Sequence, residues 1–265
     1  MEYRRLGYTD LKFSVLGLGT WAMGGSGWKA AWGPQDDAVS IATIRHAVAS
    51  GINWVDTAPV YGFGHSETVV GQALKGLSPR PMVATKCGRV PASDGYNITN
   101  DLSRAAVKAE CEQSLRRLGI ACIDLYQIHW NQPENQLEEA WSAIAELRAE
   151  GKIRYGGVSN FTVAQMIRLQ NLAPLASLQP PYSLFNRAIE AAHLDWCREH
   201  QVGVIVYSPL EKGLLTGKVT ADWVNALPAD DHRRQDGRFL EPARTANLAF
   251  VAELQAVAAL TGHDR

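Results

Sequence analysis

The chain has 265 residues, and its content of 46% hydrophobic and 20% charged residues is typical of a folded globular protein. Its 26 lysines and arginines nearly balance 27 aspartates and glutamates, and this net charge of −1 predicts no binding to nucleic acid or to a membrane. The apolar runs are too short to span a bilayer, and four scattered cysteines without a CxxC pair predict free thiols in the cytoplasm.

Short apolar segments alternate with amphipathic helical patterns along the chain. Residues 3–14 predict a hairpin that turns at residues 7–10. Seven short strands follow, at residues 15–18, 53–56, 82–86, 123–129, 153–159, 176–179 and 202–207. Helical periodicity predicts the intervening helices at residues 37–50, 66–77, 103–118, 137–150, 162–171 and 189–199, and a last helix at residues 244–260.

The order of these elements predicts an α/β fold. Successive strands lie about 30 residues apart, the spacing that right-handed parallel crossovers require. A doubly wound sheet fits the pattern, but its unbroken regularity favours a (β/α)8 TIM barrel with the N-terminal β-hairpin closing the bottom. Because no linker or change of composition interrupts the chain, residues 1–265 are expected to form a single domain.

The last part of the chain departs from a complete barrel. A long loop at residues 208–242 follows the seventh strand, and loops of this length are usually functional. The final helix leads directly to residues 262–265, without an eighth strand. An open parallel barrel exposes two strand edges, so we expect that the closing strand has been lost from this chain by truncation.

Polar or aromatic side chains follow all seven predicted strands, at the face where barrels of this kind perform their chemistry. These residues are Thr20, Asp56 with Tyr61, Lys86, His129, Ser159 with Asn160, Gln179, and Tyr207. Four of them, Asp56, Tyr61, Lys86 and His129, form a coherent acid catalyst. A lysine ammonium lowers the pKa of a neighbouring tyrosine, an aspartate keeps that lysine charged, and a histidine binds the oxygen that is protonated.

This set offers no activated nucleophile and no source of electrons, so it predicts a hydride-donating cofactor. Taken alone, each residue has a structural explanation. Asp56 suits a turn or a helix cap, and His129 suits a satisfied interior histidine. Lys86 is the exception, because a lysine in a buried strand is costly unless it is paired. Their joint placement at strand ends favours catalysis.

Four segments carry a family resemblance: GLGTW at residues 17–21, DTAPVYG at 56–62, IRYGGVSNF at 153–161 and YSPL at 207–210. With these motifs the chain resembles the aldo-keto reductase superfamily over essentially its whole length. The segments GLLTGK at residues 213–218 and QPPYSLF at 179–185 are similar to the bacterial branch that includes Bacillus general stress and inositol-cluster reductases and potassium-channel β-subunits.

The resemblance implies a (β/α)8 barrel that binds NADPH (NADP+) without a Rossmann motif and reduces a small-molecule carbonyl substrate. It implies that Tyr61 is the general acid, that Asp56 and Lys86 tune it, and that His129 orients the carbonyl. Members of this branch continue with an eighth strand and a segment that grips the adenosine 2′-phosphate. Without that segment, we expect weak binding of NADPH and leave the choice between NADPH and NADH open.

The resemblance also implies the binding residues. Ser159, Asn160 and Gln179 are expected to hydrogen-bond the nicotinamide carboxamide, while Tyr207 stacks on the ring. The other expected cofactor contacts are Gly19, Thr20, Trp21, Asp56, Ser208, Pro209, Leu210, Gly213, Leu214 and Lys218. The substrate is expected to contact Trp21, Tyr61, His129 and Trp130. Specificity is expected from the loops at residues 23–33, 88–100 and 131–135, whose tryptophans suggest an apolar pocket without a fixed grip for a carboxylate.

Two other function classes compete with a carbonyl reductase. A nucleotide-binding redox sensor or regulatory subunit with little turnover keeps the same residues, so only turnover distinguishes it. A TIM-barrel hydrolase requires paired carboxylates or a metal cluster at the strand ends. Asp56 is the only predicted strand-end carboxylate, so we expect no hydrolase and no metal. The sequence names no physiological substrate and does not distinguish a monomer from a homo-oligomer.

Overall fold

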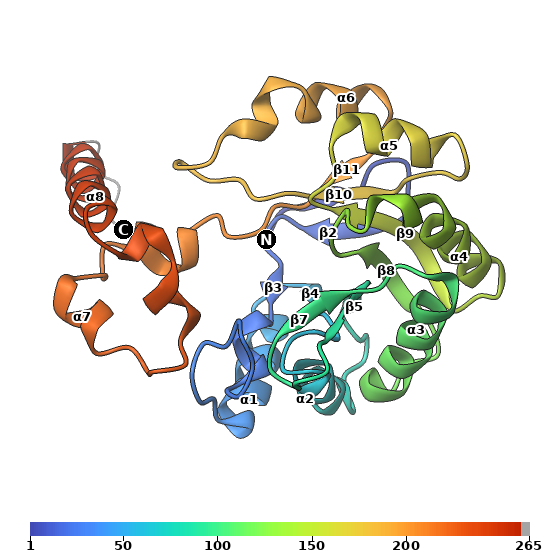
Figure 1. The fold of residues 1–265 in the computed structure, drawn as a ribbon, viewed down its shortest axis with the longest axis horizontal. Coiled ribbons are helices and arrows are strands. Elements are labelled where there is room, and N and C mark those ends of the chain that lie inside the picture. Colours follow the sequence, from blue (N-terminus) through green and yellow to red (C-terminus); the bar gives the residue numbers. More distant parts are fainter. Residues whose placement is uncertain (261–265) are drawn as a thin grey trace.

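The computed structural model describes residues 1–260 and contains a curled sheet of seven parallel strands surrounded by helices (Figure 1). Neighbouring strands in this sheet follow the order of the chain, and every pair is parallel. The strands are β3 (Leu18–Gly19), β4 (Trp54–Asp56), β5 (Met82–Cys87), β8 (Ile123–Ile128), β9 (Ile153–Ser159), β10 (Ser177–Gln179) and β11 (Gly203–Val204). This is the predicted barrel sheet, with β3 and β11 as its two edges within the described residues.

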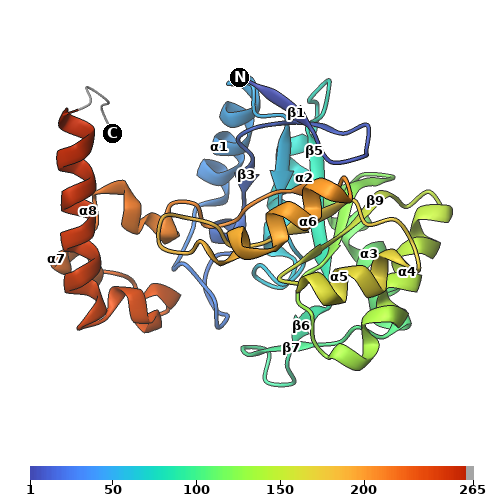
Figure 2. The same cartoon turned by 90° about the horizontal axis from the view of Figure 1, so that it is seen from above.

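Helices cover the outer face of the sheet, and each packs against the next from α1 to α5 (Figures 1 and 2). They are α1 (Asp37–Ala49), α2 (His65–Leu74), α3 (Arg104–Leu118), α4 (Leu137–Ala149), α5 (Val163–Gln170) and α6 (His193–Glu199). Side chains cap the N-termini of three of these helices. Asp36 and Ser103 accept hydrogen bonds from backbone amides of α1 and α3. Thr162 forms a capping box with Gln165 of α5.

The N-terminal hairpin closes the amino-terminal end of the barrel, as predicted. Its strands β1 (Tyr3–Arg5) and β2 (Lys12–Ser14) are antiparallel. Leu6, Leu11 and Phe13 pack into one apolar cluster with inward-facing residues of the barrel strands. Phe13 stacks on Trp54 at the start of β4, with ring centroids 4.6 Å apart. This contact lies below the strand ends that carry the polar residues.

The two edge strands are shorter than predicted. Val15 and Leu16, expected in the first strand, are 46% and 60% exposed, because Val15 continues the hairpin by donating its amide to Glu2. The seventh strand ends at Val204 instead of Tyr207. Its neighbour β10 runs into Pro180 and Pro181, which have no N–H to donate, so only an isolated bridge joins Pro181 to Tyr207.

Three other segments also differ from prediction. The helix expected at residues 189–199 is divided into a 3₁₀ turn (Ala188–Ala191) and α6, because Ala192 has a non-helical φ of −154°. The loop at residues 88–100 contains an unpredicted hairpin of β6 (Arg89–Pro91) and β7 (Ile98–Asn100). The loop at residues 208–242 is largely built of short helical turns and α7 (Ala221–Asn225).

The chain ends in a small cluster beside the barrel, where α7 and the predicted last helix, α8 (Ala243–Leu260), lie apart from the other helices (Figure 1). Its core is apolar and consists of Leu214, Val219, Val224, Leu227 and Phe239. Residues 262–265, which led us to expect a truncated chain, lie outside the described residues.

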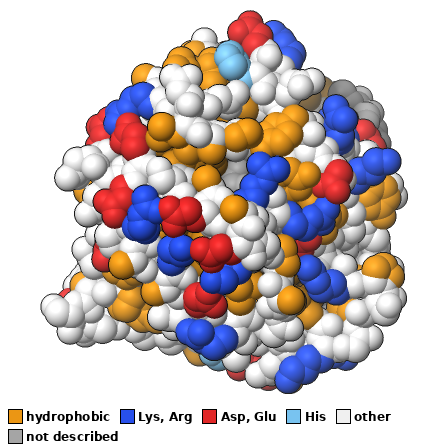
Figure 3. Space-filling view, turned by 90° about the vertical axis from the view of Figure 1, so that its right-hand side faces the viewer, with side chains coloured by type: hydrophobic (Ala, Val, Ile, Leu, Met, Phe, Trp, Pro, Cys, Tyr) orange, Lys and Arg blue, Asp and Glu red, His pale blue; other side chains and the backbone are white. Residues whose placement is uncertain are grey.

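The surface carries charges of both signs, which are interspersed on the face shown in Figure 3. This mixture accords with the net charge of −1. Within residues 1–260, no helix is both long enough and apolar enough to cross a membrane.

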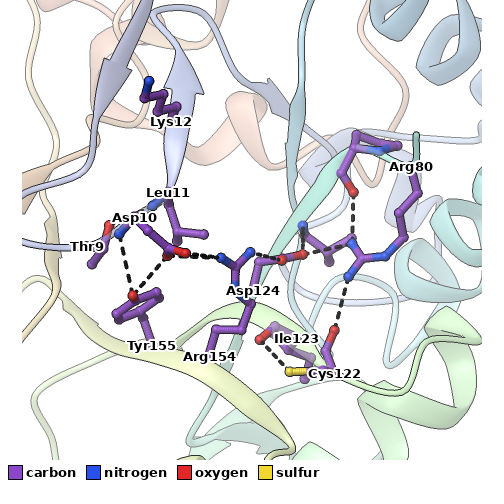
Figure 4. A network of polar contacts seen from close by, with 12 residues as sticks. Thr9, Asp10, Leu11, Lys12, Arg80, Cys122, Ile123, Asp124, Arg154 and Tyr155 are labelled. Carbon is purple, nitrogen blue, oxygen red and sulfur yellow. Dashed lines mark hydrogen bonds and ion pairs between the residues drawn. The ribbon is translucent and has the colours of Figure 1, made fainter. Parts of the chain in front are cut away.

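A buried carboxylate joins the hairpin to the barrel (Figure 4). Asp124 of β8 is only 4% exposed and accepts hydrogen bonds from Arg80 at 2.8 Å, Arg154 at 2.9 Å and the amide of Val83 at 2.9 Å. The guanidinium of Arg154 also binds Asp10 at the hairpin turn, at 2.9 Å. Asp124 therefore holds strands β5, β8 and β9 and the hairpin in one network.

Replacing Asp124 is expected to destabilise the fold. Asp124→Ala leaves two arginines without their shared buried partner and should lower the free energy of unfolding by about 3 kcal/mol. Asp195→Ala is the matched control, because Asp195 pairs with Arg198 while 63% exposed and should change stability far less. Urea unfolding of both variants measures the difference. Equal losses would show that the buried network does not hold the hairpin in place.

Candidate active site

A cavity of about 930 Å³ extends from the carboxyl ends of the strands to the N-terminal hairpin, where Arg5 and Phe13 line it. Its wall contains the polar residues predicted from the strand ends, except that Lys86 lies beneath its floor. The lining residues from the predicted site are Gly19, Thr20, Trp21, Asp56, Tyr61, His129, Trp130, Ser159, Asn160, Gln179, Tyr207, Ser208 and Pro209. The parallel register of the sheet therefore brings together side chains that are far apart in the sequence.

The floor of the cavity is an ion pair that touches a phenol. The Lys86 side chain is 1% exposed and donates to Asp56 Oδ2 at 2.6 Å, to the Thr57 carbonyl at 2.9 Å and to Tyr61 Oη at 3.3 Å. Asp56 and Lys86 lie on adjacent strands, β4 and β5. Tyr61 lies in the turn between β4 and α2, with its amide bonded to the Ala58 carbonyl. All three donor positions of the ammonium are therefore used.

The pKa of Tyr61 is shifted in the opposite direction from the one that the sequence predicts. Burial disfavours the charge of Lys86, but Asp56 and Tyr61 outweigh it and raise the pKa of the ammonium. Burial is also the largest influence on Tyr61 and raises the pKa of its phenol. The charge of Lys86 lowers that pKa, as expected, but less than burial raises it. Tyr61 is therefore a protonated phenol throughout the neutral range.

His129 stands directly after β8, with its ring edge toward Tyr61 and the ring centroids 5.8 Å apart. Burial and the charges of Lys86 and Arg89 hold the pKa of His129 well below its usual value. The imidazole is therefore neutral at physiological pH. A neutral ring has one N–H to donate, so His129 can bind an oxygen without competing with Tyr61 as an acid.

The ends of β9, β10 and β11 are joined by hydrogen bonds among the predicted nicotinamide-binding residues. Gln179 donates to Asp56 Oδ1 at 2.9 Å, and Ser159 donates to the Gln179 carbonyl at 2.8 Å. Asn160 donates to the His129 carbonyl at 3.1 Å and accepts from Tyr207 at 2.8 Å. The side-chain amide of Asn160 thus orients Tyr207. Burial raises the pKa of the Tyr207 phenol to about 12.

The predicted cofactor loop after β11 is only partly at the cavity. Ser208 and Pro209 line it, whereas Leu210, Gly213, Leu214 and Lys218 do not. Leu214 is fully buried in the small C-terminal core, so its side chain serves packing. Ser208, Glu211 and Lys212 have left-handed backbones, with φ of 52°, 47° and 56°. Such backbones are costly for these residue types and persist where a site requires them.

Tryptophans form one wall of the cavity. Trp21 stacks near Tyr61, with ring centroids 6.2 Å apart, and Trp28 is 2% exposed. Trp130 directly follows His129 in the sequence and is 38% exposed. Behind Trp21 lies His232, whose ring stacks on that indole at 4.7 Å and meets Trp32 edge-on at 4.9 Å.

Several residues at the site were not predicted. Lys212 lines the cavity, pairs with Asp236 at 2.7 Å and lies 5.4 Å from the Trp21 ring centroid. Arg89 of β6 also lines it. The three arginines of the long loop each have a partner within the loop or its neighbouring segments. Arg233 pairs with Asp231, Arg234 donates to the Leu227 carbonyl, and Arg238 pairs with Asp236 and Glu211.

Comparison with known proteins identifies the family. A model of the Aldo/keto reductase family matches residues 15–264. The chain is 41% identical over 262 residues to the aldo-keto reductase YhdN of Bacillus subtilis. This match covers 97% of this chain and 76% of YhdN. It is 43% identical over 233 residues to the NADH-specific methylglyoxal reductase of Escherichia coli. This match covers 83% of this chain and 70% of the reductase.

Solved structures agree with the fold. The glycerol dehydrogenase AKR11B4 from Gluconobacter oxydans superposes with a TM-score of 0.87 at 40% identity, over 99% of this chain and 79% of that one. An aldo-keto reductase from Klebsiella pneumoniae in complex with NADPH superposes with a TM-score of 0.64 at 35% identity. That match covers 78% of this chain and 66% of the Klebsiella chain.

The contacts of His232 predict a pH effect on stability. Nδ1 donates to the Ala31 carbonyl at 3.0 Å, and Nε2 is buried without a hydrogen-bond partner among the described residues. Burial lowers the pKa of His232 to about 4, with Lys212 and Arg233 acting in the same direction and Asp231 against them. Because the unfolded chain binds this proton first, stability should fall as the pH drops from the ordinary histidine pKa toward 4.

His232→Phe keeps an aromatic ring against Trp21 and removes the titrating group. Between about pH 7 and pH 5, the wild type should lose roughly 1 kcal/mol more stability than His232→Phe. Urea unfolding at the two pH values measures this. Parallel losses in both proteins would show that His232 is not held neutral by its burial.

Proposed function

This chain belongs to the aldo/keto reductase family, and we propose that it reduces aldehydes and ketones to alcohols with a reduced nicotinamide nucleotide. The observation that carries the proposal is the contact of one buried ammonium with both a carboxylate and a phenol. Lys86 reaches Asp56 at 2.6 Å and Tyr61 at 3.3 Å at the floor of the cavity. A phenol held in this way is a proton donor for an oxygen that gains negative charge.

In the proposed mechanism the carbonyl oxygen binds between Tyr61 and His129, whose rings meet edge-on. The neutral imidazole of His129 donates a hydrogen bond that orients the oxygen and stabilises its developing charge. Tyr61 then transfers its proton to that oxygen, and Lys86 stabilises the phenolate that remains. Asp56 holds the ammonium in place and receives a second hydrogen bond from Gln179 at 2.9 Å.

The residues around Tyr207 fit a nicotinamide nucleotide. The cavity wall after strands β9 to β11 presents an aromatic ring together with amide and hydroxyl groups. Tyr207 would stack on the ring, and Ser159, Asn160 and Gln179 would line the carboxamide. When bound, a reduced nicotinamide supplies hydride to the carbonyl carbon.

We propose NADPH as the donor, because the similar Klebsiella structure was solved with NADPH. The E. coli relative, described as NADH-specific, supports the alternative donor. A small carbonyl compound is the proposed partner, in accord with the cavity volume. A cytoplasmic location stays a prediction, supported by the four cysteines, which are all free and of which three are buried.

Tyr61→Phe tests the function. The variant keeps the ring but loses the proton, so carbonyl reduction should fall at least about 100-fold while nucleotide binding is retained. The assay follows the oxidation of NADPH, and separately of NADH, with methylglyoxal and 4-nitrobenzaldehyde as substrates. Nucleotide binding is measured by calorimetry in the same preparations.

Cys122→Ala, on the opposite end of the barrel near Asp124, is the control and should turn over like the wild type (Figure 4). Turnover by Tyr61→Phe at the wild-type rate contradicts the assigned acid. Nucleotide binding by the wild type without turnover of either aldehyde contradicts an enzyme and supports a sensor or regulatory subunit.

A further inference from the structure

Among residues 1–260, one partly buried cation in the wall of the cavity has no counterion. Arg89 is the first residue of β6, directly after the Gly88 turn that ends β5, and its side chain lines the cavity. Its guanidinium lies over the Trp130 ring, 5.4 Å from the centroid. Its Nε is buried, and in residues 1–260 it has no hydrogen-bond partner. An arginine in this position has donors available for a ligand.

The other cations near the strand-end part of the cavity are paired, whereas Arg5, at the hairpin end, is exposed to solvent. Lys86 binds Asp56 at 2.6 Å, Lys212 binds Asp236 at 2.7 Å, and Arg238 binds Asp236 and Glu211. Arg89 differs, because within the described chain it takes part in no ion pair, and the groups that raise its pKa are the phenols of Tyr61 and Tyr207 instead of a carboxylate. Burial accordingly lowers the pKa of Arg89, which shows that the surroundings do not compensate its charge.

A buried carboxyl group behind this segment does not supply the missing charge. Glu110 of α3 accepts the Gly88 amide at 2.9 Å, and burial raises its pKa to about 8. Glu110 is therefore mostly protonated at neutral pH and adds little negative charge. The floor of the cavity is balanced by the Lys86–Asp56 pair, so Arg89 gives this wall a net positive charge.

Arg89 lies on the substrate side of the cavity. It follows β5 and packs on Trp130, which follows β8, and these are central neighbours in the sheet. The loop proposed to bind the cofactor follows β11, at the edge of the sheet. Because His129 and Trp130 are consecutive, a group bound by Arg89 lies next to a carbonyl held by His129 and Tyr61.

We propose that Arg89 binds an anionic oxygen group of the substrate, so that the preferred substrates are carbonyl compounds that carry a carboxylate or a phosphate. This rests on the proposed reductase function and adds the substrate class. The guanidinium fork matches both anions with two parallel hydrogen bonds, and the Trp130 ring fixes its plane. The sequence had suggested a pocket without such a grip, because nothing in the pattern GRV at residues 88–90 shows that Arg89 faces the cavity.

Matched substrates test the proposal. 4-Carboxybenzaldehyde is compared with its uncharged methyl ester, and glyceraldehyde 3-phosphate with glyceraldehyde, using the 265-residue chain with NADPH or NADH. The wild type should prefer the charged member of at least one pair, and the pair identifies whether carboxylate or phosphate is bound. Arg89→Met should lower kcat/KM for that charged substrate about 30-fold, mainly through KM, and change the uncharged one by less than about threefold.

Two further variants separate a binding role from a structural one. Arg89→Lys keeps the charge without the fork and should retain part of the preference. Arg5→Met removes a positive charge from the same cavity at its far end, on the hairpin, and should leave the preference unchanged. Equal losses for charged and uncharged substrates in Arg89→Met, or no preference in the wild type, would overturn the proposal.

A binding measurement decides the proposal even without turnover. Calorimetry compares 4-carboxybenzyl alcohol with the methyl ester of that acid, each added to the protein with NADP+. Tighter binding of the acid in the wild type, lost in Arg89→Met, supports an anion site at Arg89 even if neither aldehyde is reduced. In that case the reductase function fails while the anion site stands. Equal binding of acid and ester refutes the anion site whatever the turnover.

Discussion

The buried contact of Lys86 with Asp56 is the constraint on which the rest of the site depends. An ammonium that is 1% exposed inside a barrel is unstable unless its charge is compensated and its donors are used. Asp56 supplies the charge from the neighbouring strand, and Thr57 and Tyr61 take the other donors. The parallel pairing of β4 with β5 sets Asp56 opposite Ala84, so that Lys86, two residues further along β5, lies on the same face of the sheet and within reach of the carboxylate. A shift of one residue in that register would separate them.

Polar groups extend outward from this pair as a connected network. Gln179 joins Asp56 to the end of β10, Ser159 joins β9 to β10, and Asn160 connects His129 with Tyr207. The catalytic floor and the proposed nicotinamide wall are therefore held by the same hydrogen bonds. Arg89 lies outside this network, and its charge, unpaired within residues 1–260, is the basis of the proposed preference for anionic substrates.

The sequence predicted the centre of this fold better than its edges. The ion pair at the floor of the cavity was predictable because a lysine at the end of an apolar strand needs a partner, and the strand-end pattern supplied one. The edge strands were not, because periodicity cannot tell that Val15 pairs with the hairpin or that prolines interrupt the partner of Tyr207. The roles of Arg89 and His232 depend on contacts with Trp130 and Trp21, which no local pattern encodes.

The central claim is that the ammonium of Lys86 controls the proton of Tyr61. The most direct measurement is the pH dependence of alcohol oxidation by the wild type and by Lys86→Met, because this reverse reaction requires the Tyr61 phenolate. Lys86 lowers the pKa of the phenol against the effect of burial, so its removal should move the alkaline rise in rate to higher pH. An alkaline rise at the same pH in both proteins, with only the amplitude reduced, would contradict the account.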